Sequence, residues 1–218
     1  MPLGILGKKL GQTRVYDATG NIVAVTVVLV GSNRVVQCKS VETDGYKAVQ
    51  LGYEDQKESR VTKPQLGHFN KHKAQPVKVL REFRDFPLDV KPGDVLGAKV
   101  FNPGDAVDAI GITKGRGFEG VVKRHGFRGG DATHGCKGWK RRSGAIGQRL
   151  FPGTVMRGMK MPGHMGQVQR TTQNLKVVQV LEEDNVLLIS GAIPGSKGDY
   201  VVIREAKKKR KVAAKAAK

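Results

Sequence analysis

The stretch IVAVTVVLV, residues 22–30, decides the fold that this sequence predicts. Seven of its nine residues are β-branched, and these stiff side chains favour strands because they pack well on a pleated surface. The stretch is far shorter than the roughly 20 residues that a membrane-spanning helix needs. We therefore predict a β-strand here and expect the rest of the fold to be organised around it.

Similar short segments lie on both sides of this stretch, each bounded by Gly, Pro, Asn or Asp. Many short strands at regular spacing favour an antiparallel β-barrel or a sandwich. We expect the C-terminal strands to pair with N-terminal ones, so that the region between them is a long insertion in one mainly β domain. Further strands are predicted at 13–17, 33–40, 46–54, 77–84, 94–101, 105–113, 175–181, 185–190 and 200–204, turns at 43–45 and 182–185, and helices at 118–126, within 65–75 and in the C-terminal tail.

The composition favours a polyanionic partner. The chain has 39 Lys and Arg against 19 Asp and Glu, for a net charge of +20 and a pI near 10.2. Apolar residues make up 39% and aromatic residues 6%, which predicts an aliphatic core. The N-terminus carries its lysines after its few apolar residues, the reverse of a secretory signal. Cys38 and Cys136 match no disulfide or CxxC pattern, so we expect a reducing, cytoplasmic location.

The charge is concentrated in two segments. Residues 114–170 carry 13 Lys and Arg, only two acids and 14 of the 29 glycines, and residues 204–218 carry eight cations and one acid. The remaining residues have 18 cations against 16 acids, so they form a nearly neutral body. Low hydrophobicity with high net charge leaves a segment without a core of its own.

The segment HGCKGWKRRSGAIGQ, residues 134–148, is typical of this composition. Its apolar residues follow neither a helical nor a strand period. Its glycines allow the backbone to lie against a crowded surface, its cations suit phosphates, and Trp139 can stack on a base. We predict an arm that becomes ordered by threading between RNA helices.

The motif GRGFEG, residues 115–120, offers an alternative, because it matches the GxGxxG pattern of dinucleotide-binding proteins. That fingerprint also needs a βαβ unit and an acid about 20 residues further on, where this chain has KGWKRRSG. An RNA-acting or nucleotide-using enzyme built on this loop is therefore the second hypothesis, behind phosphate contact by its backbone and cations.

Other chemical sites are less favoured. His125, His134, Cys136 and His164 do not have the paired spacing of structural zinc ligands, and Cys136 has no scaffold for a catalytic base. Asp105 and Asp108 are expected to face solvent or to close a turn. We predict no catalytic residue, no metal, no cofactor, no small-molecule substrate and no membrane contact. The tail KKKRK, residues 207–211, lacks the bulky apolar residues of a membrane switch, so RNA contact is preferred there.

With these motifs in order, the chain resembles the bacterial form of the family of large-subunit ribosomal protein three, nearly from end to end. The segments that carry the resemblance are GILGKKLGQT, VTVVLVGSNRVVQ, DGYKAVQLGY, GHF, REFRDF, GDAVDAIGITKGRGFEGVVKRHGFRGG, HG at 134–135, GAIGQ, KMPGHMG and NLKVVQVLEEDNVLLISGAIPG.

The resemblance implies a translation-factor-like β-barrel and an arm that enters the ribosomal RNA. It implies direct binding near the 3′ end of 23S rRNA, an early role in 50S assembly, an arm approaching the peptidyl-transferase region, and ribosomal proteins fourteen and nineteen as neighbours. It also implies that Gln148 is a candidate site of methylation.

Several residues depart from the usual family pattern. Gln12 stands where Met is usual, and Ser143 and Ala145 replace Pro and Ser. The segment 151–162 also differs, at Phe151, Thr154, Met156, Met159 and Pro162. The cations usual at 154 and 159 are missing, which weakens the expectation of a phosphate contact at each.

From the residues and the resemblance together, we predict a body of residues 1–122 and 168–204, an RNA-penetrating arm of residues 123–167, and a basic tail of residues 205–218. The predicted RNA contacts are Lys114, Arg116, Lys123, Arg124, His125, Arg128, His134, Lys137, Trp139, Lys140, Arg141, Arg142, Gln148, Arg149, Arg157, Lys160, His164, Lys207, Lys208, Lys209 and Arg210.

Overall fold

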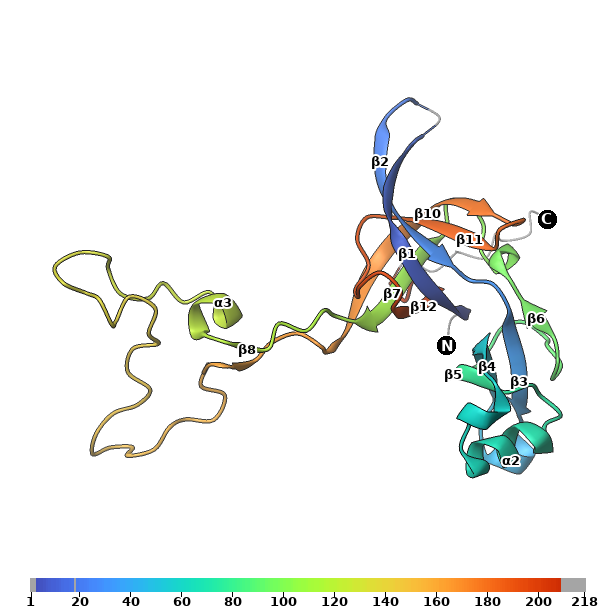
Figure 1. The fold of residues 1–218 in the computed structure, drawn as a ribbon, viewed down its shortest axis with the longest axis horizontal. Coiled ribbons are helices and arrows are strands. Elements are labelled where there is room, and N and C mark those ends of the chain that lie inside the picture. The colour runs from blue at the N-terminus through green and yellow to red at the C-terminus, as the bar shows by residue number, and fades with distance from the viewer. Residues whose placement is uncertain (1–2, 18, 209–218) are drawn as a thin grey trace, which may run out of the picture. The chain divides into compact units, whose positions relative to one another are not determined.

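Strand β1 (Gly4–Tyr16) closes a β-barrel, because its two halves pair with different neighbours. Its first residues pair antiparallel with β12 (Tyr200–Glu205), and its later residues pair antiparallel with β2 (Ile22–Leu29). The barrel order is β1-β12-β7-β10-β11-β2 (Figure 1), and the predicted antiparallel barrel is confirmed. Its other strands are β7 (Ala106–Ile112), β10 (Gln169–Leu181) and β11 (Val186–Ser190).

The computed structural model describes residues 3–17 and 19–208, and these form two units. The body consists of the described residues up to Ile112 and from Gln169 onward, and it contains the barrel. The insertion is Thr113–Val168. The predicted helix of the C-terminal tail lies outside the described residues, and so do Lys209 and Arg210.

The barrel interior is mainly aliphatic, as the low aromatic content predicts. Val28, Leu187, Ile189 and Ile203 are fully buried there. Burying a side chain of this size contributes about 1.5–3 kcal/mol, so these strands can supply a stable core. The predicted pairing of C-terminal with N-terminal strands is also confirmed, because β12 pairs with β1 and β11 with β2.

A second sheet, which the sequence analysis did not separate from the barrel, has the strand order β5-β4-β3-β6. Phe69, on a helix that was predicted near this position, packs with Val36 and Val77 in a small core of its own. The strands are β3 (Asn33–Lys39), β4 (Ala48–Asp55), β5 (Val77–Arg84) and β6 (Val95–Leu96), and the short helices of this part of the body are α1 (Val41–Asp44), η1 (Glu58–Arg60), α2 (Lys63–Lys71) and η2 (Ala98–Val100).

Polar contacts join this sheet to the barrel. The hydroxyl of Tyr200 on β12 donates to Glu54 on β4, and together with Lys8 on β1 it holds the pKa of that carboxyl below its ordinary value. The Lys8 Nζ to Glu54 Oε1 distance is 3.1 Å. The charged carboxylate is therefore the form that connects the two sheets.

Several sequence predictions need correction. The strand predicted at 94–101 stops at Leu96, because Gly97 lies against Asn185 and the following 3₁₀ turn brings Ala98 into the barrel core. The turn predicted at 43–45 is instead the end of α1, where Gly45 adopts a φ of 79°. Asp108 does not face solvent: it is 1% exposed and pairs with Arg204 at 3.6 Å. By contrast, Asp105 closes a turn by accepting a hydrogen bond from the Asn102 backbone N–H at 2.9 Å.

The strand predicted at 13–17 begins much earlier, at Gly4. Its N-terminal half was missed because glycines interrupt the apolar alternation. Gly4 lies directly against the Phe83 ring, and a Cβ on Gly7 would be only 2.6 Å from Val28 Cγ1. These glycines therefore permit close packing rather than a turn. Among the described residues, no helix is long and apolar enough to cross a membrane.

Asn33 at the start of β3 provides a buried polar link, and it generates a prediction. Its Oδ1 accepts from the Leu6 N–H at 2.8 Å, and its Nδ2 donates to the carbonyls of Leu6 and Val30, each at 2.9 Å. Asn33→Ala leaves these buried groups without partners, at about 1–3 kcal/mol for each. We expect a loss of at least about 2 kcal/mol in denaturant unfolding of the full chain.

Asn70→Ala is the matched control, because Asn70 lies exposed on α2. We expect this variant to unfold within about 0.5 kcal/mol of the parent. Equal midpoints for the two variants would contradict the role assigned to Asn33.

Candidate nucleic-acid interface

The two ends of the insertion run antiparallel to each other. The Thr113 N–H donates to the Val168 carbonyl at 3.0 Å, and Arg116 and Met165 are joined through a 2.9 Å backbone bond. Next, β8 (Phe118–Glu119) pairs with β9 (Gly163–His164). This paired segment is also the position of the GRGFEG motif, which forms no βαβ unit. The dinucleotide-enzyme hypothesis therefore lacks the fold it requires.

Helix α3 (Val121–His125) follows this paired segment and is shorter than the predicted 118–126. It ends at Gly126, which has a φ of 73°. Arg124 Nη1 donates to the Met161 carbonyl at 2.6 Å, and His125 Nε2 lies 3.0 Å from the same oxygen. These two predicted RNA contacts are thus turned toward the insertion's own returning chain.

Between His125 and Gly163 the described chain forms neither helix nor strand, as its lack of periodicity predicts. Its shape depends on a close backbone crossing. The Gly130 N–H donates to the Lys140 carbonyl at 3.1 Å, and Gly129, at a φ of 78°, leaves no room for a Cβ against that same carbonyl. The crossing therefore needs glycine at position 129.

The insertion has almost no hydrophobic core. Across Thr113–Val168, Val121 is the single buried residue, at 3% exposure. Large apolar side chains are open to solvent, including Phe118, Leu150 and Phe151. The segment therefore gains little free energy from burial of its own side chains.

The insertion is also strongly cationic, with 12 Lys and Arg against Glu119 and Asp131. Glu119 pairs with Lys123, and Asp131 pairs with Arg128 at 3.2 Å. The other ten cations have no carboxylate partner among the described residues. They are Lys114, Arg116, Arg124, Lys137, Lys140, Arg141, Arg142, Arg149, Arg157 and Lys160.

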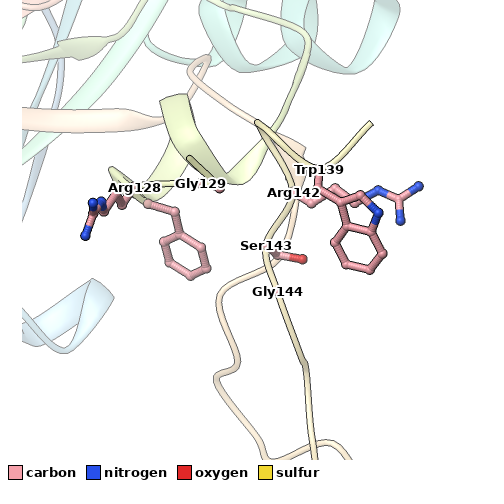
Figure 2. Close-up of a pocket in the computed structure, with 8 residues that line it drawn as sticks. Arg128, Gly129, Trp139, Arg142, Ser143 and Gly144 are labelled. Atoms are coloured by element: carbon pink, nitrogen blue, oxygen red, sulfur yellow. The ribbon is translucent and has the colours of Figure 1, made fainter. Parts of the chain in front are cut away.

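Some of the predicted RNA-contact residues are brought together and others are not. Arg128, Trp139 and Arg142 line one cavity of about 290 Å³ (Figure 2), while Gln148 and Arg149 line a second of about 430 Å³. His164 lies in β9, and Lys114 and Arg116 lie in the paired ends of the insertion.

The remaining predicted contacts are distributed along the chain. Of the tail residues, Lys207 and Lys208 follow β12 in the body. Along the irregular chain of the insertion, His134, Lys137, Lys140, Arg141, Arg157 and Lys160 are exposed.

The histidines and cysteines do not assemble into a metal site within residues 3–17 and 19–208, where no group of three His, Cys, Asp or Glu side chains is placed to hold an ion. Phe127, which lines the first cavity, was missed by the sequence analysis. The available signal was an aromatic residue next to Arg128 in a glycine-rich run, a combination suited to base contact.

Comparison with known proteins decides the family. A family model described as Ribosomal protein L3 matches residues 85–185. The large ribosomal subunit protein uL3 of Akkermansia muciniphila is 50% identical over 212 residues, covering 96% of this chain and all of the relative. The chain belongs to the uL3 family.

Two other uL3 relatives agree with this assignment. The protein from Brachyspira hyodysenteriae is 48% identical over 95% of this chain and 96% of its own length. The protein from Deinococcus radiodurans is 47% identical over 94% of this chain and 95% of its own length. The resemblance proposed from the sequence is confirmed, and the uL3 family model spans the whole insertion together with β7 and β10.

The crossing at Gly129 generates a second prediction. In Gly129→Ala the added Cβ meets the Lys140 carbonyl, so the chain must move at Trp139, the neighbouring residue. Because Trp139 is the chain's one tryptophan, we expect its fluorescence emission to change in position and intensity.

Gly138→Ala is the control for this experiment, since a Cβ at Gly138 would meet nothing within 4 Å. Its emission should match that of the parent chain. Identical spectra for all three proteins would show that the crossing does not need glycine at 129.

Proposed function

We propose that this chain is a structural, non-enzymatic constituent of the large ribosomal subunit, in the cytoplasm, that binds 23S rRNA directly through its insertion. Membership of the uL3 family supports the ribosomal role. The observation that carries the RNA-binding role is the combination of ten cations without a carboxylate partner and a single buried side chain in Thr113–Val168.

The mechanism is electrostatic ordering. Fixing the backbone of one residue costs about 1–2 kcal/mol in conformational entropy, which the single buried Val121 cannot offset over the whole insertion. Lys and Arg that neutralise phosphates release condensed counterions and so supply the missing free energy. The glycine-rich backbone can follow the surface of the RNA closely.

The place of the chain within the large subunit is part of the same proposal. The RNA-binding arm, predicted at 123–167, lies within the insertion Thr113–Val168, and the basic tail is residues 205–218. The arm approaches the peptidyl-transferase region, the chain binds near the 3′ end of 23S rRNA early in 50S assembly, and ribosomal proteins fourteen and nineteen are neighbours. These follow from the family resemblance, and the exposed position of Gln148 suits its role as a candidate methylation site.

Two groups among the proposed contact residues differ in their role. Lys137, Lys140, Arg141, Arg142, Arg149, Arg157 and Lys160 are proposed to meet phosphates. Arg124 and His125 act mainly through the Met161 carbonyl, so they hold the returning strand in place and contact RNA only with their remaining donors.

Removing three arm cations tests the electrostatic mechanism. We expect Lys140→Ala, Arg141→Ala and Arg142→Ala together to lower RNA affinity and to reduce the slope of log affinity against log salt by about 2–3. Unfolding of the body should not change, because none of the three belongs to it. Binding titrations from low to moderate salt measure both quantities.

The matched control removes three body cations, Lys63, Lys71 and Lys73, all exposed and without a carboxylate partner among the described residues. It changes the net charge by the same amount, so a long-range charge effect alone would affect both triple variants equally. Equal slopes in the two variants would refute the assignment of RNA binding to the arm.

The ribosomal role itself is tested by sedimentation of a cell lysate in high salt. We expect the chain to travel with the large subunit. Its presence only in the soluble fraction would overturn the proposal.

A further inference from the structure

We propose that the first cavity of the insertion holds one unpaired nucleobase of the RNA, a step that rests on the proposed RNA-binding function. The cavity has a volume of about 290 Å³, near the lower limit of about 300 Å³ for small-molecule pockets. Figure 2 shows Arg128 and Gly129 on one side of it and Trp139 with Arg142 on the other. Its main lining residues are Phe127, Arg128, Gly129, Trp139, Arg142 and Ser143.

Trp139 supplies the stacking surface. The guanidinium carbon of Arg142 lies over its ring, 4.5 Å from the ring centre, and covers one face. The side chain is nevertheless 61% exposed, so a partner can reach the ring. Bases stack on indole rings whatever their sequence, and Arg adds a cation–π contribution, so this pair is suited to an unpaired base.

The polar groups of the cavity favour an acceptor-rich ligand. Arg128 and Arg142 offer only donors, Ser143 can donate through its hydroxyl, and no carboxylate lines the cavity. Asp131 lies nearby but is paired with Arg128 at 3.2 Å. Acceptors on a base edge, such as N7 of adenine, and the adjoining phosphate match this set of donors.

The backbone crossing shapes the cavity. Gly129 lies against the Lys140 carbonyl, and a Cβ on Gly130 would be 3.2 Å from both Cys136 Sγ and the Trp139 carbonyl oxygen. The hydrogen bond from Gly130 to Lys140 holds the two chain segments together beside the cavity. A base would therefore meet a site formed by backbone contacts as well as by side chains.

The experiment uses the fluorescence of Trp139, the single tryptophan of the full chain. The chain is titrated with a ten-nucleotide oligoadenylate, with inorganic polyphosphate of similar charge, and with adenosine monophosphate. We expect saturable quenching with the oligonucleotide and no comparable quenching with polyphosphate, although both bind. Adenosine monophosphate should need an at least tenfold higher concentration for the same quenching, because it lacks the neighbouring phosphates.

A second experiment measures the affinity of variants by the fluorescence anisotropy of labelled oligonucleotides. Trp139→Ala should lower affinity for oligoadenylate by roughly five- to a hundredfold, and should leave affinity for an abasic oligonucleotide of equal length unchanged. Phe151→Ala is the control, since Phe151 is an exposed aromatic residue of the same insertion that does not line the cavity. This control should retain the preference for bases.

The outcomes separate the two proposals. If the chain binds neither RNA oligonucleotide nor polyphosphate, the RNA-binding function fails and the cavity proposal fails with it. If polyphosphate quenches as strongly as oligoadenylate, or if Trp139→Ala retains the base preference, the cavity does not hold a base although RNA binding stands. Equal quenching by adenosine monophosphate would identify a free-nucleotide site and would also overturn the proposal.

Discussion

The shortage of buried apolar surface in Thr113–Val168 is the constraint on which the rest of this molecule depends. One buried side chain, Val121, cannot offset the entropy of ordering so long a segment. The proposed RNA partner meets this shortage, whereas the body has an aliphatic core of its own. The separation of charge follows from the same constraint, because a cationic segment with few acids does not fold on itself but does gain from a polyanion.

The barrel meets this constraint through the pairing of β7 with β10. Ile112 is paired with Gln169, so the two ends of the insertion leave the body from neighbouring positions in one sheet. A long segment can then be inserted without breaking the order of the barrel strands. Closure by β1, which pairs with both β12 and β2, removes the open edges that an extended sheet would expose.

The body was largely predictable because its strands are β-branched and bounded by turn residues, as in IVAVTVVLV. The misses have local causes in packing. The start of β1 was hidden by Gly4 and Gly7, whose missing side chains make room for Phe83 and Val28. Nothing in a linear pattern separates β3, β4, β5 and β6 from the barrel, since strand pairing is decided by contacts between distant residues. The burial of Asp108 likewise depends on Arg204, which is far away in the sequence.

The insertion shows a different limit of prediction from sequence. Its composition predicts the class of partner but not the path of the backbone. Glycine content alone does not show whether a glycine has open space around it or lies against a neighbouring group. Gly138 has open space around its Cα, whereas Gly129 is pressed against the Lys140 carbonyl. The first kind of glycine only loosens the chain, but the second allows a backbone crossing that no other residue permits. In the proposed function, electrostatic attraction to phosphate acts over the whole insertion and cannot place one side chain. The crossing is what brings Trp139 and Arg142 to a defined position, so affinity and geometry here have separate physical origins.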